Sequence, residues 1–187
     1  ADAVLMGNKL VYAAAGSSGL QGMADGLELT PTFGIPISQI KILRAGGIQD
    51  MSQPKGNIED DKSAAISDAE IIESGDCVIC LAASGNTTYP SVIMKIANKV
   101  GATTIGIANN PDTELLVGSD IPVLLQTPPE VVAGSTRLCE GTAQKIALNT
   151  MSTYMGILLG HVMDGQMVNL IANNAKLFKR SEKIVMN

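Results

Sequence analysis

Two short turns rich in serine and glycine have the residue types needed to bind a phosphate group. The first spans residues 16–19 (GSSG) after the apolar run LVYAAA, and the second spans 84–88 (SGNTT) after CVICLAA. A strand that turns into a helix through small hydroxyl residues presents unpaired N–H groups, hydroxyl donors and the positive end of a helix dipole to one point. We therefore predict one phosphorylated ligand held between the turns by Ser17, Ser18, Gly19, Ser84, Gly85, Asn86, Thr87 and Thr88.

Each turn also has a simpler interpretation. Either one fits an ordinary helix start in which glycine permits close packing. The first turn spells G-x-x-G-x-x-G through Gly16, Gly19 and Gly22, which differs from the G-x-G-x-x-G of dinucleotide-binding proteins. The strand predicted next ends in RAGG rather than in an acidic residue, so a dinucleotide site is the weaker interpretation.

Two glutamates could supply acid–base chemistry. Glu28 precedes Pro31, which we expect to end the helix that starts at the first turn, and the negative end of the helix dipole favours a protonated carboxyl group there. Glu28 would then be a partly buried general acid, or else an exposed terminal glutamate. Glu59 follows Asn57, a predicted helix cap, and an acid in a first helical turn also stabilises the helix on its own account. The only histidine is His161, near a predicted helix end, so a Ser-His-Asp or Cys-His mechanism would depend on it alone.

The three cysteines predict neither a disulfide nor a metal site. Cys77 and Cys80 lie in one predicted buried strand, where three steps span roughly 10 Å and turn the two side chains to opposite faces. No cluster of histidine, cysteine and aspartate has the spacing of metal ligands, so we expect no metal. Free thiols at Cys77, Cys80 and Cys139 fit a reducing cytoplasm, and we expect a cytoplasmic protein.

The composition predicts one α/β domain over 1–187. Of the 187 residues 45% are hydrophobic, and the net charge is −5, with one basic cluster at 176–183, which argues against nucleic acid as a main partner. No apolar stretch approaches the roughly 20 residues of a membrane span. Short apolar runs alternate with helical segments, the pattern of a parallel sheet between helices in a three-layer α/β/α sandwich. We predict strands within 9–16, 39–46, 76–84, 103–110 and 121–127. We also predict one helix that starts at 57–61 and three that cover 89–100, 136–160 and 166–180.

Taken together, these stretches resemble the sugar isomerase (SIS) domain superfamily. Within it, the chain is most similar to the N-acetylmuramic acid 6-phosphate etherases and the related glucokinase regulatory proteins. The stretches that carry the resemblance are YAAAGSSG, PTFGIP, RAGG, the IEDD at Ile58, CLAASGNTTY, ANNP, GSTRL, GTAQK and ANNAKL, which span nearly the whole chain in order. The resemblance implies a single SIS-type domain with a five-stranded parallel sheet of the flavodoxin type. It also implies dimers that bind sugar phosphates near the subunit boundary.

By this resemblance Glu28 and Glu59 match the acid–base pair of the etherases. Glu59 would remove the C2 proton of the open-chain sugar, which the adjacent aldehyde acidifies, and Glu28 would protonate the departing lactyl ether oxygen at C3. Glu28 could later activate water for addition. The reaction requires no metal or organic cofactor, and the same resemblance suggests additional contacts from Ser135, Arg137 and Lys145.

Three positions depart from the family pattern. Leu20 and Asn86 stand where the family's two turns carry arginine, and Cys139 stands where the GSTR segment is followed by lysine. Fewer cations are expected to weaken binding of a phosphorylated, carboxylate-bearing substrate or to change which substrate fits. A phosphosugar-binding regulatory module and an aldose–ketose isomerase therefore stay open beside the lyase. The apolar residues of 136–160 predict a homodimer.

Overall fold

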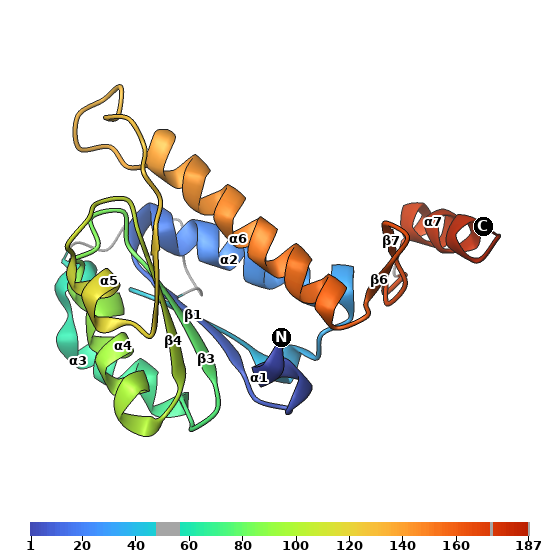
Figure 1. Cartoon of the computed structure of the whole chain (residues 1–187), viewed down its shortest axis with the longest axis horizontal. Helices are drawn as coiled ribbons and strands as arrows, with labels where there is room; N and C mark the ends of the chain where they lie inside the picture. The colour runs from blue at the N-terminus through green and yellow to red at the C-terminus, as the bar shows by residue number, and fades with distance from the viewer. Residues whose placement is uncertain (48–56, 173, 187) are drawn as a thin grey trace.

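The sheet lies at the centre of the molecule and has five parallel strands. The computed structural model describes residues 1–47, 57–172 and 174–186. Its strand order is β2-β1-β3-β4-β5 (Figure 1), so the predicted five-stranded parallel sheet is confirmed. The strands are β1 (Leu10–Ala14), β2 (Ile40–Arg44), β3 (Cys77–Leu81), β4 (Thr103–Ala108) and β5 (Ile121–Leu124).

Helices cover both faces of this sheet. On one face lie α2 (Gly16–Phe33) and α6 (Cys139–Leu158), and on the other lie α3 (Lys62–Asp68), α4 (Thr88–Val100) and α5 (Glu114–Gly118), as Figure 1 shows. The shorter elements are α1 (Asp2–Leu5) and the 3-10 turns η1 (Ile37–Gln39), η2 (Ile58–Asp60) and η3 (Ala69–Ile71). This is the predicted three-layer α/β/α sandwich.

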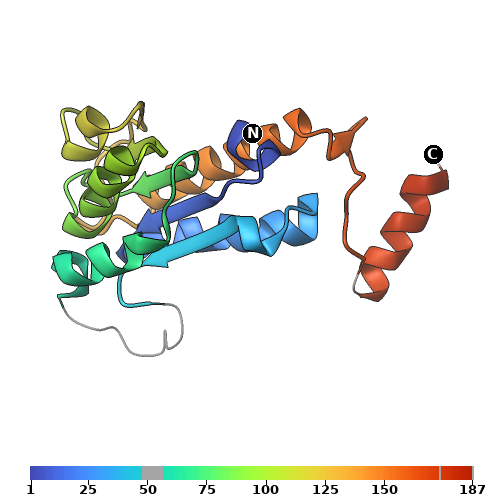
Figure 2. The same ribbon diagram turned by 90° about the horizontal axis from the view of Figure 1, so that it is seen from below.

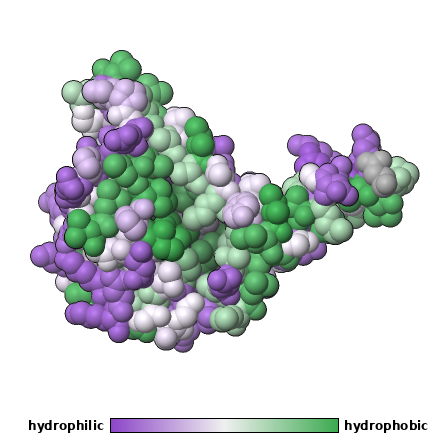
Figure 3. Space-filling model, viewed as in Figure 1, coloured by the Kyte–Doolittle hydropathy of each residue, from purple (hydrophilic) through white to green (hydrophobic). Residues whose placement is uncertain are grey.

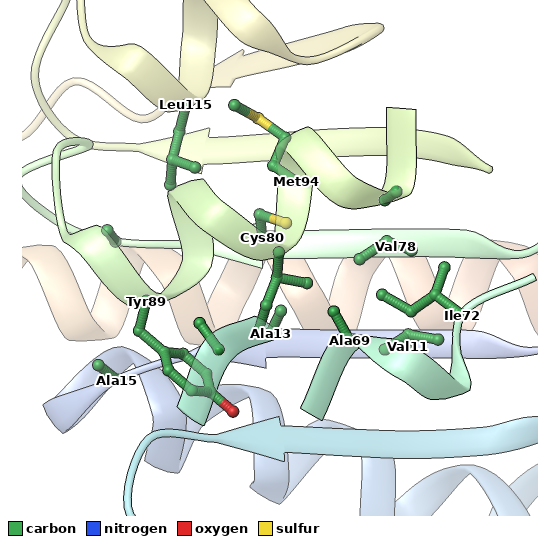
Figure 4. Close-up of a cluster of buried hydrophobic side chains, with 14 of the residues drawn as sticks. Val11, Ala13, Ala15, Ala69, Ile72, Val78, Cys80, Tyr89, Met94 and Leu115 are labelled. Atoms are coloured by element: carbon green, nitrogen blue, oxygen red, sulfur yellow. The ribbon is translucent and has the colours of Figure 1, made fainter. Parts of the chain in front are cut away.

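Alternate strand residues fill two separate cores, one on each face. Val11 and Ala13 belong to one cluster with Tyr89 of α4, in which Val11 lies near Ile72 (Figure 4), whereas Tyr12 of the same strand belongs to the second cluster with Leu29 of α2. Strands that are buried on both faces consist of continuous apolar runs, and this is why they could be predicted from the sequence. The same alternation places Cys80 in the first core and Cys77 against the second. The three cysteines are free, as expected.

Two predicted helix boundaries are wrong. The first helix does not stop before Pro31 but runs on to Phe33, because Gly34 adopts a left-handed conformation (φ 69°) and donates its N–H to the Thr30 carbonyl. Asn57 occupies the cap position of the 3-10 turn η2, not of an α-helix, and its side chain makes no capping bond. Asp61 caps α3 instead, accepting from the N–H of Ala64 at 3.0 Å.

The carboxyl-terminal part differs most from the prediction. In place of a helix over 166–180, a short hairpin of β6 (Val162–Met163) and β7 (Gln166–Met167) precedes α7 (Ala175–Met186). α7 projects away from the sheet in Figures 1 and 2 and contributes no buried residue. Among the helices that the structure describes, none has the length and apolar character needed to cross a bilayer.

Candidate functional site

Both serine-rich turns lie at the carboxyl edge of the sheet. Ala14 pairs in register with Arg44 on one side and with Leu81 on the other, so the three strands end level. After β1 the chain continues to β2 on one side, and β3 then lies on the opposite side of β1. The topological switch point of the sheet therefore lies between β1 and β3. Ligands of such folds bind in the crevice that forms there.

The first turn begins α2 directly after β1. Gly16 has a φ of +52°, a conformation that side chains rarely adopt, and it turns the chain into the helix. The first N–H groups of a helix have no partner within it, so those of Gly16, Ser17 and Ser18 are available to an anion. Ser18 itself is buried, and the Ser17 hydroxyl lies 2.9 Å from that of Thr136, in the segment before α6.

Glu59 lies against this turn. A Cβ added at Gly16 would lie 2.6 Å from Oε1 of Glu59, so the carboxylate occupies the space directly over the first residue of α2. Its neighbour Ile58 packs tightly against Gly46, where an added Cβ would lie 2.7 Å from Cδ1 of Ile58. Gly46, just after β2, thus contacts η2, and η2 places the Glu59 carboxylate at the amino end of α2.

The second turn is tied to the same 3-10 segment. The Thr88 hydroxyl donates to Oδ1 of Asp60 at 3.1 Å, and the hydroxyls of Ser84 and Thr87 lie 3.2 Å apart. Gly85 has a φ of +73°, and a Cβ there would overlap the side chain of Thr113. Glu59 therefore lies on a segment that contacts both turns.

Asn86 has a structural contact of its own. Its side-chain oxygen accepts a hydrogen bond at 2.9 Å from the backbone N–H of Glu114, the first residue of α5. That oxygen stabilises the start of α5 and leaves the side-chain NH2 group of Asn86 as a possible donor to a ligand.

Glu28 lies far from Glu59 within one chain. It is exposed and sits more than three turns along α2 from Gly16, about 18 Å at 1.5 Å per residue. The partial burial that the sequence predicted for the Glu28 carboxyl group is not observed. Among the residues that the structure describes, its carboxylate accepts one long hydrogen bond, of 3.5 Å, from the Thr32 hydroxyl. Leu27 and Ile37 are exposed apolar side chains that line one hollow beside this part of α2.

The three additional candidates lie on the segment that supplies Thr136 and on α6. Ser135 is half-buried and donates its N–H to the Val132 carbonyl at 2.9 Å, whereas Arg137 and Lys145 are exposed. In the part of the chain that the structure describes, no polar contact joins Arg137 or Lys145 to either turn. His161 follows the far end of α6, a helix about 30 Å long.

An unexpected carboxyl group lies at the start of α6. Oε2 of Glu140 is buried, and among the described residues it has no hydrogen-bond partner. Burial raises the pKa of Glu140, and the neighbouring carboxylate of Glu130 raises it further. Within 1–47, 57–172 and 174–186, no three histidine, cysteine or acidic residues gather closely enough to hold a metal ion.

Curated relatives named N-acetylmuramic acid 6-phosphate etherase are similar to this chain over nearly its whole length. It is 44% identical over 183 residues to the N-acetylmuramic acid 6-phosphate etherase of Deinococcus radiodurans, covering 97% of this chain and 60% of that protein. It is 41% identical over 180 residues to the protein of the same name from Oceanobacillus iheyensis, covering 95% and 61%. The chain thus spans about 60% of the length of these relatives. No family model matches it.

Solved structures share the fold at low sequence identity. The C-terminal domain of glucosamine-fructose-6-phosphate aminotransferase from Francisella tularensis has a TM-score of 0.62 at 17% identity, covering 98% of this chain and 44% of that one. The Vibrio vulnificus NanR protein complexed with ManNAc-6P has a TM-score of 0.53 at 13% identity, covering 98% and 56%. The resemblance expected from the sequence is confirmed by the curated relatives, and the solved structures match the fold.

Proposed function

We propose that this chain, a homologue of the N-acetylmuramic acid 6-phosphate etherases over nearly its whole length, binds a phosphorylated amino sugar and cleaves its lactyl ether. The observation that carries the proposal is the position of the Glu59 carboxylate, over Gly16 and on a segment that contacts both hydroxyl-rich turns. A base in that position lies within reach of a sugar whose phosphate binds at the turns.

The proposed reaction is an elimination followed by hydration. Glu59 removes the C2 proton of the open-chain sugar, which is acidic because it is adjacent to the aldehyde. The electron pair left at C2 forms the C2–C3 double bond and expels the lactyl oxygen from C3, and a general acid protonates that oxygen as lactate leaves. The general acid, now deprotonated, then takes a proton from water as its oxygen adds to C3, and Glu59 returns a proton to C2. The N–H groups of the first turn of α2, with Ser17 and the hydroxyls of Ser84, Thr87 and Thr88, hold the phosphate.

The general acid in this proposal is Glu28 from a second copy of the chain. Within one chain, about 18 Å of helix separates Glu28 from the first turn, too far for both carboxylates to reach one sugar. Exposed apolar residues support a homodimer. Leu27 and Ile37 lie near Glu28, and a hollow of about 640 Å³ beside β5 and α6 is lined by apolar side chains on the face shown in Figure 3.

Lactate release from N-acetylmuramic acid 6-phosphate tests the reaction. We expect the parent protein to release lactate, and Glu59→Gln and Glu28→Gln each to lose at least a hundredfold in rate. Glu182→Gln, on α7, removes the same charge far from the turns and is expected to keep the parent rate. A parent protein that releases no lactate would refute the proposal.

Mixing the two inactive variants tests the shared site. In a dimer of one Glu28→Gln chain and one Glu59→Gln chain, one of the two sites keeps both carboxylates. An equimolar mixture that exchanges subunits should therefore recover about a quarter of the parent activity. If both carboxylates act from one chain, mixing restores nothing.

A binding module without chemistry is the second candidate. The observation that favours it is that position 86 is an asparagine, whose side-chain oxygen accepts from the N–H of Glu114, so this residue brings no cation to the second turn. Tight binding of N-acetylglucosamine 6-phosphate, together with no lactate release from N-acetylmuramic acid 6-phosphate, would favour this function. Proton exchange at C2 of a hexose phosphate without elimination would indicate an isomerase. Free Cys77, Cys80 and Cys139 support the further proposal that the protein works in a reducing cytoplasm.

A further inference from the structure

Arg44 is a cation beside the first turn that the proposed mechanism does not use. It is the last residue of β2 and pairs in register with Ala14, the last residue of β1. Its side chain lies over Gly19, because a Cβ added there would be 3.1 Å from Cγ and 3.5 Å from Cδ of Arg44. The arginine therefore lies along the turn whose N–H groups face the proposed phosphate.

The guanidinium group of Arg44 is incompletely paired. Nη1 donates to the carbonyl of Gly47 at 3.0 Å, whereas Nε is buried and has no hydrogen-bond partner among the described residues. The ion pairs of the described residues involve Lys9 and Lys95, and none includes Arg44. A buried donor without a partner destabilises the folded chain.

Arg44 adds a second positive group to the amino end of α2, where the Glu59 carboxylate lies over Gly16. The amino end of α2 itself carries partial positive charge. An anion bound at the turn would be attracted to both the helix and the guanidinium, and it would offer an acceptor to the unpaired donors. Leu20, the residue after Gly19, is 43% exposed and offers no donor of its own.

We propose that Arg44 binds the phosphate group of the phosphosugar from the β2 side of the first turn. This inference rests on the proposed function, and it assigns a cation from a strand end to a site otherwise built from hydroxyl and backbone donors. A guanidinium offers two parallel N–H donors to one phosphate, so a lysine at the same place keeps the charge but loses that geometry.

Calorimetric titration with N-acetylglucosamine 6-phosphate tests this role, since that sugar has a phosphate and no carboxylate. We expect Arg44→Met to raise the Kd at least tenfold, and the Kd of Arg44→Lys to lie between those of Arg44→Met and the parent protein. Lys41→Met removes a cation from the same strand, three residues before Arg44, and is expected to leave the Kd unchanged. For neutral N-acetylglucosamine, the Kd of Arg44→Met should equal that of the parent protein.

Thermal unfolding separates binding from packing. Because Arg44 has a buried unpaired donor, Arg44→Met should unfold at or above the parent temperature while its Kd rises. A lower melting temperature with an unchanged Kd would overturn the inference and leave the proposed function intact. Weaker binding confined to N-acetylmuramic acid 6-phosphate would also overturn it, because Arg44 would then contact the carboxylate. A parent protein that binds neither phosphosugar overturns both proposals.

Discussion

Replacing Gly16 by alanine tests the contact between Glu59 and the first turn. The added Cβ would lie 2.6 Å from Oε1 of Glu59, closer than any stable contact, at a residue whose φ is +52°. The backbone strain costs roughly 1–2 kcal/mol, which in a protein of this size lowers the melting temperature by about 2–8 °C. The carboxylate is the end of a rotatable side chain, so it should move away rather than displace the helix.

The consequence for activity should be much larger than the consequence for folding. A general base contributes about 10²- to 10⁴-fold to a rate, so we expect Gly16→Ala to lose at least a hundredfold in lactate release. Gly7→Ala is the matched control, because Gly7 also has a positive φ (+83°) but nothing lies within 4 Å of an added Cβ. It should show the loss of stability alone. Full lactate release by Gly16→Ala would refute the role given to Glu59 at this position.

Three further substitutions test the supports of the site. Gly85→Ala would overlap Thr113 and strain a φ of +73°, so we expect urea unfolding to show a loss of about 2 kcal/mol or more. Asn86→Ala removes the acceptor for the N–H of Glu114 and should cost about 1 kcal/mol. If it instead weakened phosphosugar binding tenfold without loss of stability, the structural role would be wrong. The pKa of Glu140 is raised on folding, so its charge costs stability at pH 8 and not at acidic pH. Glu140→Gln should therefore unfold at a higher temperature than the parent at pH 8, with the difference shrinking as the pH falls; a difference that grows on acidification would contradict this.

Local pattern was enough to predict the sheet and most helices. Continuous apolar runs located all five strands, and Gly101, which ends α4 with a φ of +82°, marked its boundary correctly. The pattern failed where tertiary contacts decide. α2 continues past Pro31 because Phe33 packs into the core and against Gly156 of α6, a contact between residues far apart in the sequence.

In the site, too, local sequence pattern predicted some residues and tertiary contacts decided others. The two turns were identified from residue types next to predicted strand ends, and Glu59 from the family resemblance; the structure brings those segments to one edge of the sheet. Thr136 and Arg44 were not assigned a role, because their roles depend on neighbours more than 20 residues away, Ser17 and Gly19. For Arg44 the sequence did offer a signal, a cation at the end of the strand beside the first turn.

The separation of Glu28 from Glu59 could not have been foreseen from their spacing in the sequence. Glu59 returns to the start of α2 because η2 follows β2, which runs parallel to β1 and ends level with it. Glu28 stays near the other end of the same 18-residue helix. A parallel α/β fold brings strand ends together but keeps the two ends of each crossover helix apart, so an acid late in α2 and a base after β2 can meet only across an interface between chains. The proposed chemistry therefore depends on a second copy, and oligomeric state and activity should be lost together.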